Sequence, residues 1–163
     1  MYINIAIDAR KSGRYPIEWS YGIAWRYDDS RIYAKCYRFT GGRRTRRIFS
    51  YAYLDYLLAL VILITNVASS IPIKIDYIKA YICKDFIPPD IGVFCNRIEL
   101  LIYEYTKATC SVEFITRKDA KSNANIMELY KKAHTMAECR SSSWKDIRDK
   151  VVKRIKELDI GRS

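Results

Sequence analysis

Residues 3–8 read Ile-Asn-Ile-Ala-Ile-Asp, so isoleucines alternate with smaller or polar residues and the stretch closes on an aspartate. This period of two predicts a β-strand with one face against a core. We expect Asp8 to end that strand. Residues 19–26 alternate in the same way, and the turn signal at residues 28–30 leads into a third β-rich segment over 32–39. The three strands are expected to form an antiparallel meander.

The rest of the chain alternates helical and β-like segments. A long, largely apolar segment over 49–66 predicts a central helix, and Pro72 follows its end. Residues 73–76, Ile-Lys-Ile-Asp, predict a short fourth strand that again ends on an aspartate, Asp76. The remaining expected elements are one or two helical turns over 77–83, a helix over 96–107 with an Asn96 cap, a fifth strand over 109–115, a polar loop over 118–123 and a helix over 125–138.

The length of 163 residues fits one compact domain. We place this domain at residues 1–140, because a polar serine run over 140–143 is the best candidate boundary. Residues 141–163 are predicted to form a basic amphipathic C-terminal helix. Its apolar side would carry Trp144, Ile147, Val151, Ile155 and Leu158.

The charge balance is strongly basic, with 29 Lys+Arg against 18 Asp+Glu and a formal net charge of +11. Such a charge favours polyanionic partners, either nucleic acid or an acidic membrane surface. The apolar stretch from 48 to 68 behind the arginines of 43–47 has the look of a membrane helix. However, its uninterrupted part runs only from Tyr56 to Ile64, and Asp55 lies inside the longer window. A helix buried in a globular core is the better interpretation, so we expect no membrane partner.

The five cysteines are widely spaced and form no C-x-x-C pair, which favours neither a zinc site nor a disulfide framework. We expect mostly buried thiols in a reducing compartment, although one disulfide stays open. The first residues carry no signal-peptide pattern, so a cytoplasmic location is expected. Richness in Ile, Tyr, Lys and Arg is compatible with a thermophilic source.

The order of three antiparallel strands, a central helix and two further strands alternating with helices resembles the ribonuclease H-like superfamily, most closely the archaeal-type ribonuclease HI. The resemblance covers about residues 1 to 138. It rests on Ile-Ala-Ile-Asp at 5–8, Ile-Lys-Ile-Asp at 73–76 and the segment from Ser111 to Ala133. It implies an α/β fold with a five-stranded mixed sheet and helices on both faces. It also implies that Asp8 and Asp76 lie side by side at the carboxyl ends of neighbouring parallel strands.

What the resemblance implies for the site is a carboxylate cluster holding Mg²⁺ or Mn²⁺, the cations that hard oxygen ligands suit. Asp8, Asp55 and Asp76 would be the catalytic metal ligands. A register one turn earlier would put Ala52 in place of Asp55. The fourth position aligns with Asn125, and Glu128, one helical turn later, is the alternative ligand.

The implied function is a metal-dependent nuclease that hydrolyses RNA in an RNA–DNA hybrid or a related structured nucleic acid. The alternative is a binding module of the same fold that has lost catalysis, which the asparagine at position 125 motivates. His134, the only histidine, is expected to be exposed or packed rather than catalytic. Backbone phosphates would be bound by basic residues near the site, namely Arg10, Lys11, Arg14, Arg43, Arg44, Arg46 and Arg47.

Overall fold

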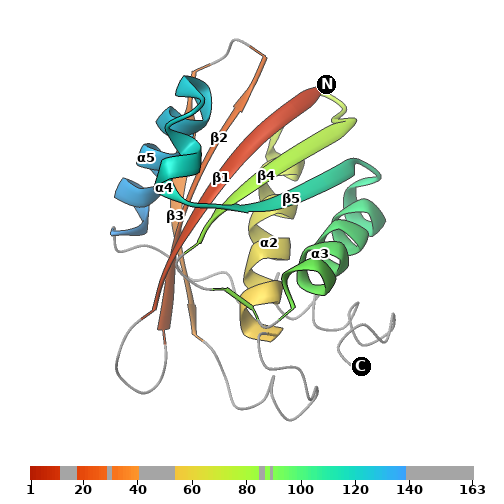
Figure 1. Cartoon of the computed structure of the whole chain (residues 1–163). Coiled ribbons are helices and arrows are strands. Elements are labelled where there is room, and N and C mark those ends of the chain that lie inside the picture. The colour runs from red at the N-terminus through yellow and green to blue at the C-terminus, as the bar shows by residue number, and fades with distance from the viewer. Residues whose placement is uncertain (12–17, 29–30, 41–53, 85–86, 89, 139–163) are drawn as a thin grey trace.

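The computed structural model describes residues 1–11, 18–28, 31–40, 54–84, 87–88 and 90–138. These residues form an α/β fold built on a five-stranded mixed sheet with the strand order β3-β2-β1-β4-β5 (Figure 1). The strands are β1 (Tyr2–Lys11), β2 (Glu18–Tyr27), β3 (Tyr33–Thr40), β4 (Tyr77–Cys83) and β5 (Thr109–Ile115). The expected α/β class and five-stranded mixed sheet are confirmed.

The first three strands pair antiparallel, whereas β1, β4 and β5 run parallel. The predicted meander is therefore confirmed, and the fifth strand begins and ends where the sequence predicted. One boundary is wrong: β1 continues to Lys11, so Asp8 lies inside the strand and does not end it. The continuous pairing of β1 with β2, from Ile3 opposite Tyr27 to Lys11 opposite Trp19, is what extends the strand.

The fourth strand is the main correction to the predicted elements. Residues 77–83 were expected to be helical and residues 73–76 to be the strand, but β4 is Tyr77–Cys83. The reason lies in the burial pattern, because Ile78, Ala80 and Ile82 all face the core. Three apolar residues at a period of two make a better buried strand than the shorter Ile-Lys-Ile run that precedes them.

Helices cover both faces of the sheet, as expected (Figure 1). On one side lie α2 (Leu54–Ser70) and α3 (Ile91–Thr106), and on the other lie α4 (Arg117–Ala120) and α5 (Ala124–Ala137). The α3 helix begins five residues earlier than predicted, because Asp90, and not Asn96, caps it by accepting a hydrogen bond from the Val93 amide. The loop expected over 118–123 contains the short helix α4, which starts with a capping box formed by Thr116 and Asp119.

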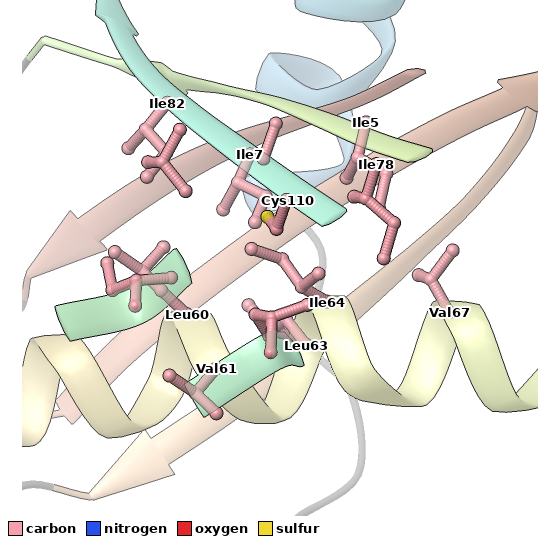
Figure 2. Close-up of a cluster of buried hydrophobic side chains, with 14 of the residues drawn as sticks. Ile5, Ile7, Leu60, Val61, Leu63, Ile64, Val67, Ile78, Ile82 and Cys110 are labelled. Carbon is pink, nitrogen blue, oxygen red and sulfur yellow. The ribbon is translucent and has the colours of Figure 1, made fainter. Parts of the chain in front are cut away.

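The main core lies between α2 and the sheet. Isoleucines of β1 and β4, such as Ile5, Ile7 and Ile78, point toward Leu60 and Ile64 of α2 (Figure 2). Every described side chain of α2 from Tyr56 to Ile64 is at most 1% exposed. The apolar stretch is thus a buried core helix, and no helix in the described ranges is long and apolar enough to cross a membrane.

The packing on the opposite face is closer and made by small residues. Ala6 of β1 and Ala24 of β2 form a second buried cluster with Leu129 and Ala133 of α5. A Cβ atom added to Gly22 would lie 1.8 Å from the Ala133 carbonyl oxygen. The α5 backbone therefore rests directly on β2, and this contact needs a residue without a side chain at position 22.

The described cysteines behave as small apolar residues, as predicted. Cys36, Cys83, Cys95 and Cys110 are all buried. Burial, with a smaller contribution from the Glu99 carboxylate, raises the pKa of Cys95 to about 11 and that of Cys110 to about 12. The fifth, Cys139, lies outside the described residues.

Candidate functional site

Asp8 is a buried carboxylate in the middle of the sheet. It lies on the central strand β1, directly opposite Gly22 of β2, and only 1% of it is exposed. Among the described residues it is the one charged side chain that is fully buried. Burying an ionised carboxylate is costly without hydrogen-bonding partners, so its surroundings decide what it does.

The partner that the structure places against Asp8 is His134 of α5. The Nδ1 atom of His134 lies 2.9 Å from Oδ2 of Asp8, and the histidine side chain is 52% exposed. Arg10, two residues after Asp8 on the same face of β1, reaches over this ring. The Nη2 atom of Arg10 lies 3.1 Å from Nε2 of His134 and 2.8 Å from Oε1 of Glu138.

These contacts define the proton on the histidine ring. A guanidinium group has only donors, so the Nε2 atom of His134 accepts from Arg10. The Nδ1 atom then carries the ring proton, and this Nδ1–H group donates a hydrogen bond to Asp8, which is the arrangement of a neutral imidazole. Glu138, Arg10, His134 and Asp8 form a chain of hydrogen bonds from the surface to the buried carboxylate.

The close packing of α5 on β2 is what brings this chain together. Since Gly22 has no side chain, Ala133 can approach the sheet opposite Asp8, and the next residue, His134, then reaches the carboxylate. His134 is half-exposed, in line with the prediction, but its contact with Asp8 was not predicted. A sequence signal did exist in the glycine at position 22, which interrupts an alternating strand, because such a glycine often marks a close backbone approach.

Asp76 does not lie beside Asp8, so the expected pair is wrong. Asp76 precedes β4, at the end of the sheet where the parallel strands begin, and Tyr77 pairs with Tyr2. Along β1, the distance from position 2 to position 8 is about 20 Å. The Asp76 carboxylate instead accepts a hydrogen bond from the amino group of Met1. This bond, and the positive charge of the same amino group, lower the pKa of Asp76.

Asn125 and Glu128 are also remote from Asp8. Both contact Arg26 of β2: Glu128 Oε2 lies 2.7 Å from its Nη2 atom, and Asn125 Oδ1 lies 3.5 Å from its Nη1 atom. Arg26 pairs with Asn4 near the start of β1, so the first turn of α5 lies at the start of that strand, whereas His134 in the last turn reaches Asp8. Positions 125 and 134 are about 14 Å apart along the helix axis. The expectation that either residue joins Asp8 in a metal site is therefore wrong.

Asp55 lies in the first turn of α2. Its neighbour Tyr56 stacks on Tyr21, which pairs with Ala9, so this turn lies at the same end of the sheet as Asp8. The Asp55 side chain and the alternative position Ala52 lie outside the described residues. The choice between them stays a prediction.

Two of the seven basic residues expected to bind phosphate are described. Arg10 is 42% exposed in its side chain and already bonds to His134 and Glu138. Lys11 is the last residue of β1. The other predicted residues, Arg14, Arg43, Arg44, Arg46 and Arg47, lie outside the described residues, as does the predicted C-terminal helix at 141–163.

The described donors do not by themselves fit a divalent metal ion. No three His, Cys, Asp or Glu side chains in this part of the chain come close enough to hold one. Asp8 and His134 offer one carboxylate and one imidazole, and the carboxylate already accepts from the imidazole, whereas Mg²⁺ prefers oxygen ligands, namely carboxylates completed by water. A metal site at Asp8 would need further carboxylates from residues whose side chains are not described.

The sheet order, the strand directions and the helices on both faces are those of the ribonuclease H-like topology. The fold therefore assigns the described residues to this topological class. No protein-family model matches the sequence, and the search of curated proteins gives no match. Fold alone does not specify function, which has to be argued from the site.

Proposed function

We propose that this domain is a metal-dependent nuclease of the ribonuclease H-like type, acting on RNA in an RNA–DNA hybrid or on a related structured nucleic acid. The observation that carries the proposal is Asp8, a buried carboxylate on the central strand of a sheet with the 3-2-1-4-5 order. The net charge of +11 supports a polyanionic substrate.

The second metal ligand in this proposal is Asp85 and no longer Asp76. The resemblance implies an aspartate at the carboxyl end of the strand that lies beside β1. That strand ends at Cys83, and the last paired residues are Ile7 and Ile82, so the end of β4 is level with Asp8. Asp85 is the first acidic residue after this end in the sequence, and it lies outside the described residues. Asp55, from the helix turn at the same end of the sheet, would complete the set.

A second candidate is a nucleic-acid-binding domain of this fold without cleavage. It is favoured by the bonding of Asp8 to His134, together with the binding of Asn125 and Glu128 to Arg26. In that case the Asp8 network stabilises the packing of α5 on the sheet and does no chemistry.

The deciding experiment incubates the full chain with a labelled RNA–DNA hybrid in Mn²⁺, in Mg²⁺ or in EDTA. The nuclease proposal expects metal-dependent cleavage that falls to the EDTA background in Asp8→Asn and in Asp85→Asn. Asp76→Asn is the matched control, because it removes a carboxylate at the other end of the sheet and is expected to leave cleavage unchanged.

A thermal shift supplies a readout that does not depend on activity. Mn²⁺ is expected to raise the unfolding midpoint of the chain, because a ligand that binds the folded state stabilises it. The shift should vanish in Asp8→Asn and persist in Asp76→Asn. Hybrid binding without cleavage in either metal, and without a Mn²⁺ shift, would reject the nuclease in favour of the binding domain.

A further inference from the structure

In the part of the chain that the structure describes, one face of the parallel strands is largely without a helix. The α5 helix packs on β1, β2 and β3, the short α4 on the same side contacts β5, which it follows in the chain, and α2 and α3 lie on the other side (Figure 1). Among the described elements, none of these helices covers the α5 side of β4 at residues 77–81 or of β5 at residues 109–113, where the side chains on that side are exposed or half-buried. Parallel strands are normally covered on both faces of the sheet, so an uncovered face of such strands is a candidate binding surface.

We call this surface the open face, and it is made by side chains at alternate positions of three strands. On β4 the residues at 77, 79 and 81 are exposed or half-buried, while those between them are buried. Their partners on β5, at 109, 111 and 113, are all exposed. The full set is Tyr2, Asn4, Tyr77, Lys79, Tyr81, Thr109, Ser111 and Glu113.

Two tyrosine rings dominate the open face. Tyr2 is 51% exposed and Tyr77 is 55% exposed, and their ring centroids lie 6.4 Å apart. The strand register places them directly opposite each other on β1 and β4. Half-exposed aromatic rings held on a rigid sheet form a stacking platform, because every nucleic-acid base has a π-face to place on them.

The residues around the rings can form hydrogen bonds, and none of them is aliphatic. Lys79 lies in the centre, where its Nζ atom is 3.1 Å from Ser111 Oγ, 3.2 Å from Glu113 Oε2 and 5.5 Å from the centre of the Tyr81 ring. The Lys79–Glu113 pair is exposed on its acidic side, and such pairs are weak, so Lys79 can exchange this partner for a phosphate. The charged pair Lys79–Glu113 in the middle of the face is of the kind that is depleted from the cores of protein–protein interfaces.

We propose that the open face binds an unpaired strand of nucleic acid, with bases stacked on Tyr2 and Tyr77 and the backbone contacted by Lys79. The net charge of +11 gives such a strand a general attraction to the chain. Tyr2 and Tyr77 form the first pair of β1 and β4, so the two rings lie at the opposite end of the sheet from Asp8. The inference shares with the proposed function only the kind of partner, since it requires no cleavage at Asp8.

The test measures binding of the full chain to a fluorescein-labelled, unstructured oligonucleotide of about twelve nucleotides by anisotropy. Tyr77→Ala and Tyr2→Ala are each expected to weaken binding about tenfold, in the range found for the loss of one stacked base. Tyr77→Phe keeps the ring and should bind as the unmodified chain does. Glu113→Gln removes the one carboxylate of the open face and should strengthen binding at low salt.

The matched control is Tyr103→Ala. Tyr103 belongs to α3, on the other side of the sheet, and is also 51% exposed. If Tyr103→Ala weakens binding as much as Tyr77→Ala does, or if neither variant has an effect, the open face is not the site. A change of oligomeric state in Tyr77→Ala, measured by sedimentation, would show that a second copy covers the face and would also overturn the proposal.

The two proposals fail separately. Asp8→Asn is expected to abolish cleavage of the hybrid while leaving oligonucleotide binding intact. Tyr77→Ala is expected to weaken oligonucleotide binding in the anisotropy assay while retaining the Mn²⁺ shift of the unfolding midpoint. Loss of cleavage with unchanged stacking therefore bears on Asp8 alone, and the opposite result bears on the open face alone.

Discussion

The Nδ1–H group of His134 donates a hydrogen bond to Oδ2 of Asp8 across 2.9 Å, joining the last turn of α5 to the middle of the central strand. The histidine ring is in turn held by Arg10, which also binds Glu138. A buried carboxylate is thus connected to the surface by a chain of hydrogen bonds between side chains that are far apart in the sequence.

Replacing His134 by alanine tests the strength of this contact. A hydrogen bond to a charged group contributes about 1.5–3 kcal/mol, and half-exposure of the ring lets water recover part of it. We expect His134→Ala to lower the free energy of unfolding by about 1–2 kcal/mol, as measured by urea denaturation. Lys132→Ala, at an exposed position of the same helix, is the control and should change stability by less than about 0.5 kcal/mol. Equal effects of the two variants would show that the Asp8–His134 bond does not stabilise the fold.

Gly22 is expected to tolerate no side chain. A Cβ atom there would lie 1.8 Å from the Ala133 carbonyl oxygen and 2.3 Å from the Ala137 amide nitrogen, and both atoms belong to the helix backbone. The helix would have to move away from β2, so Gly22→Ala should cost about 3 kcal/mol or more in unfolding free energy.

A matched glycine is available in Gly92, in the first turn of α3, where an added Cβ meets only the Asp90 Oδ1 atom at 3.8 Å. Gly92→Ala should stabilise the protein by about 0.5 kcal/mol, because alanine favours the helix. A small effect of Gly22→Ala, comparable to that of Gly92→Ala, would contradict the close packing of α5 on the sheet.

Asp76 should contribute to the acid sensitivity of the fold. Its pKa is lowered in the folded chain by the hydrogen bond from the Met1 amino group and by the charge of that group. A carboxyl group with a depressed pKa adds stability above its unfolded pKa, near 3.9, and this stability is lost as the pH falls through the folded value. Asp76→Asn should therefore flatten the fall of the unfolding midpoint between about pH 5 and pH 2. An unchanged acid profile in Asp76→Asn would show that the amino-group contact is not maintained in solution.

The thiols of Cys95 and Cys110 should resist alkylation in the folded state. With pKa values raised to about 11 and about 12, only about 0.1% and 0.01% of these groups are thiolates at pH 8. Treatment with iodoacetamide followed by peptide mass spectrometry should leave both unmodified in buffer and modify both in concentrated urea. Rapid labelling of either one without denaturant would contradict their burial.

Much of the fold could be predicted from local periodicity. The alternation around Ile5 and Ile7 and around Ile23 and Trp25 predicted buried strands, and both pairs are in the core. The apolar segment Tyr56 to Ile64 predicted a buried helix in the same way. These predictions succeeded because the period of a strand or a helix is recorded in neighbouring residues.

The arrangement of the site could not be predicted to the same extent. Asp8 was predicted to end the first strand and to belong to the candidate site, but its partner there was expected to be Asp76. Moving the fourth strand from residues 73–76 to residues 77–83 carries Asp76 from one end of the sheet to the other. A local ambiguity between two short Ile-containing runs therefore changes which carboxylates can meet.

By itself, the sequence determined most of the strands and helices, the apolar faces of those elements, and the strongly basic character of the chain, but not the position of the fourth strand. The tertiary structure alone decided which side chain meets Asp8, because that depends on the register between β1 and β4 and on how closely α5 approaches Gly22. Periodicity reflects interactions between neighbours along the chain. Register and helix approach result from packing between distant segments, where one buried strand or one missing side chain can decide the outcome.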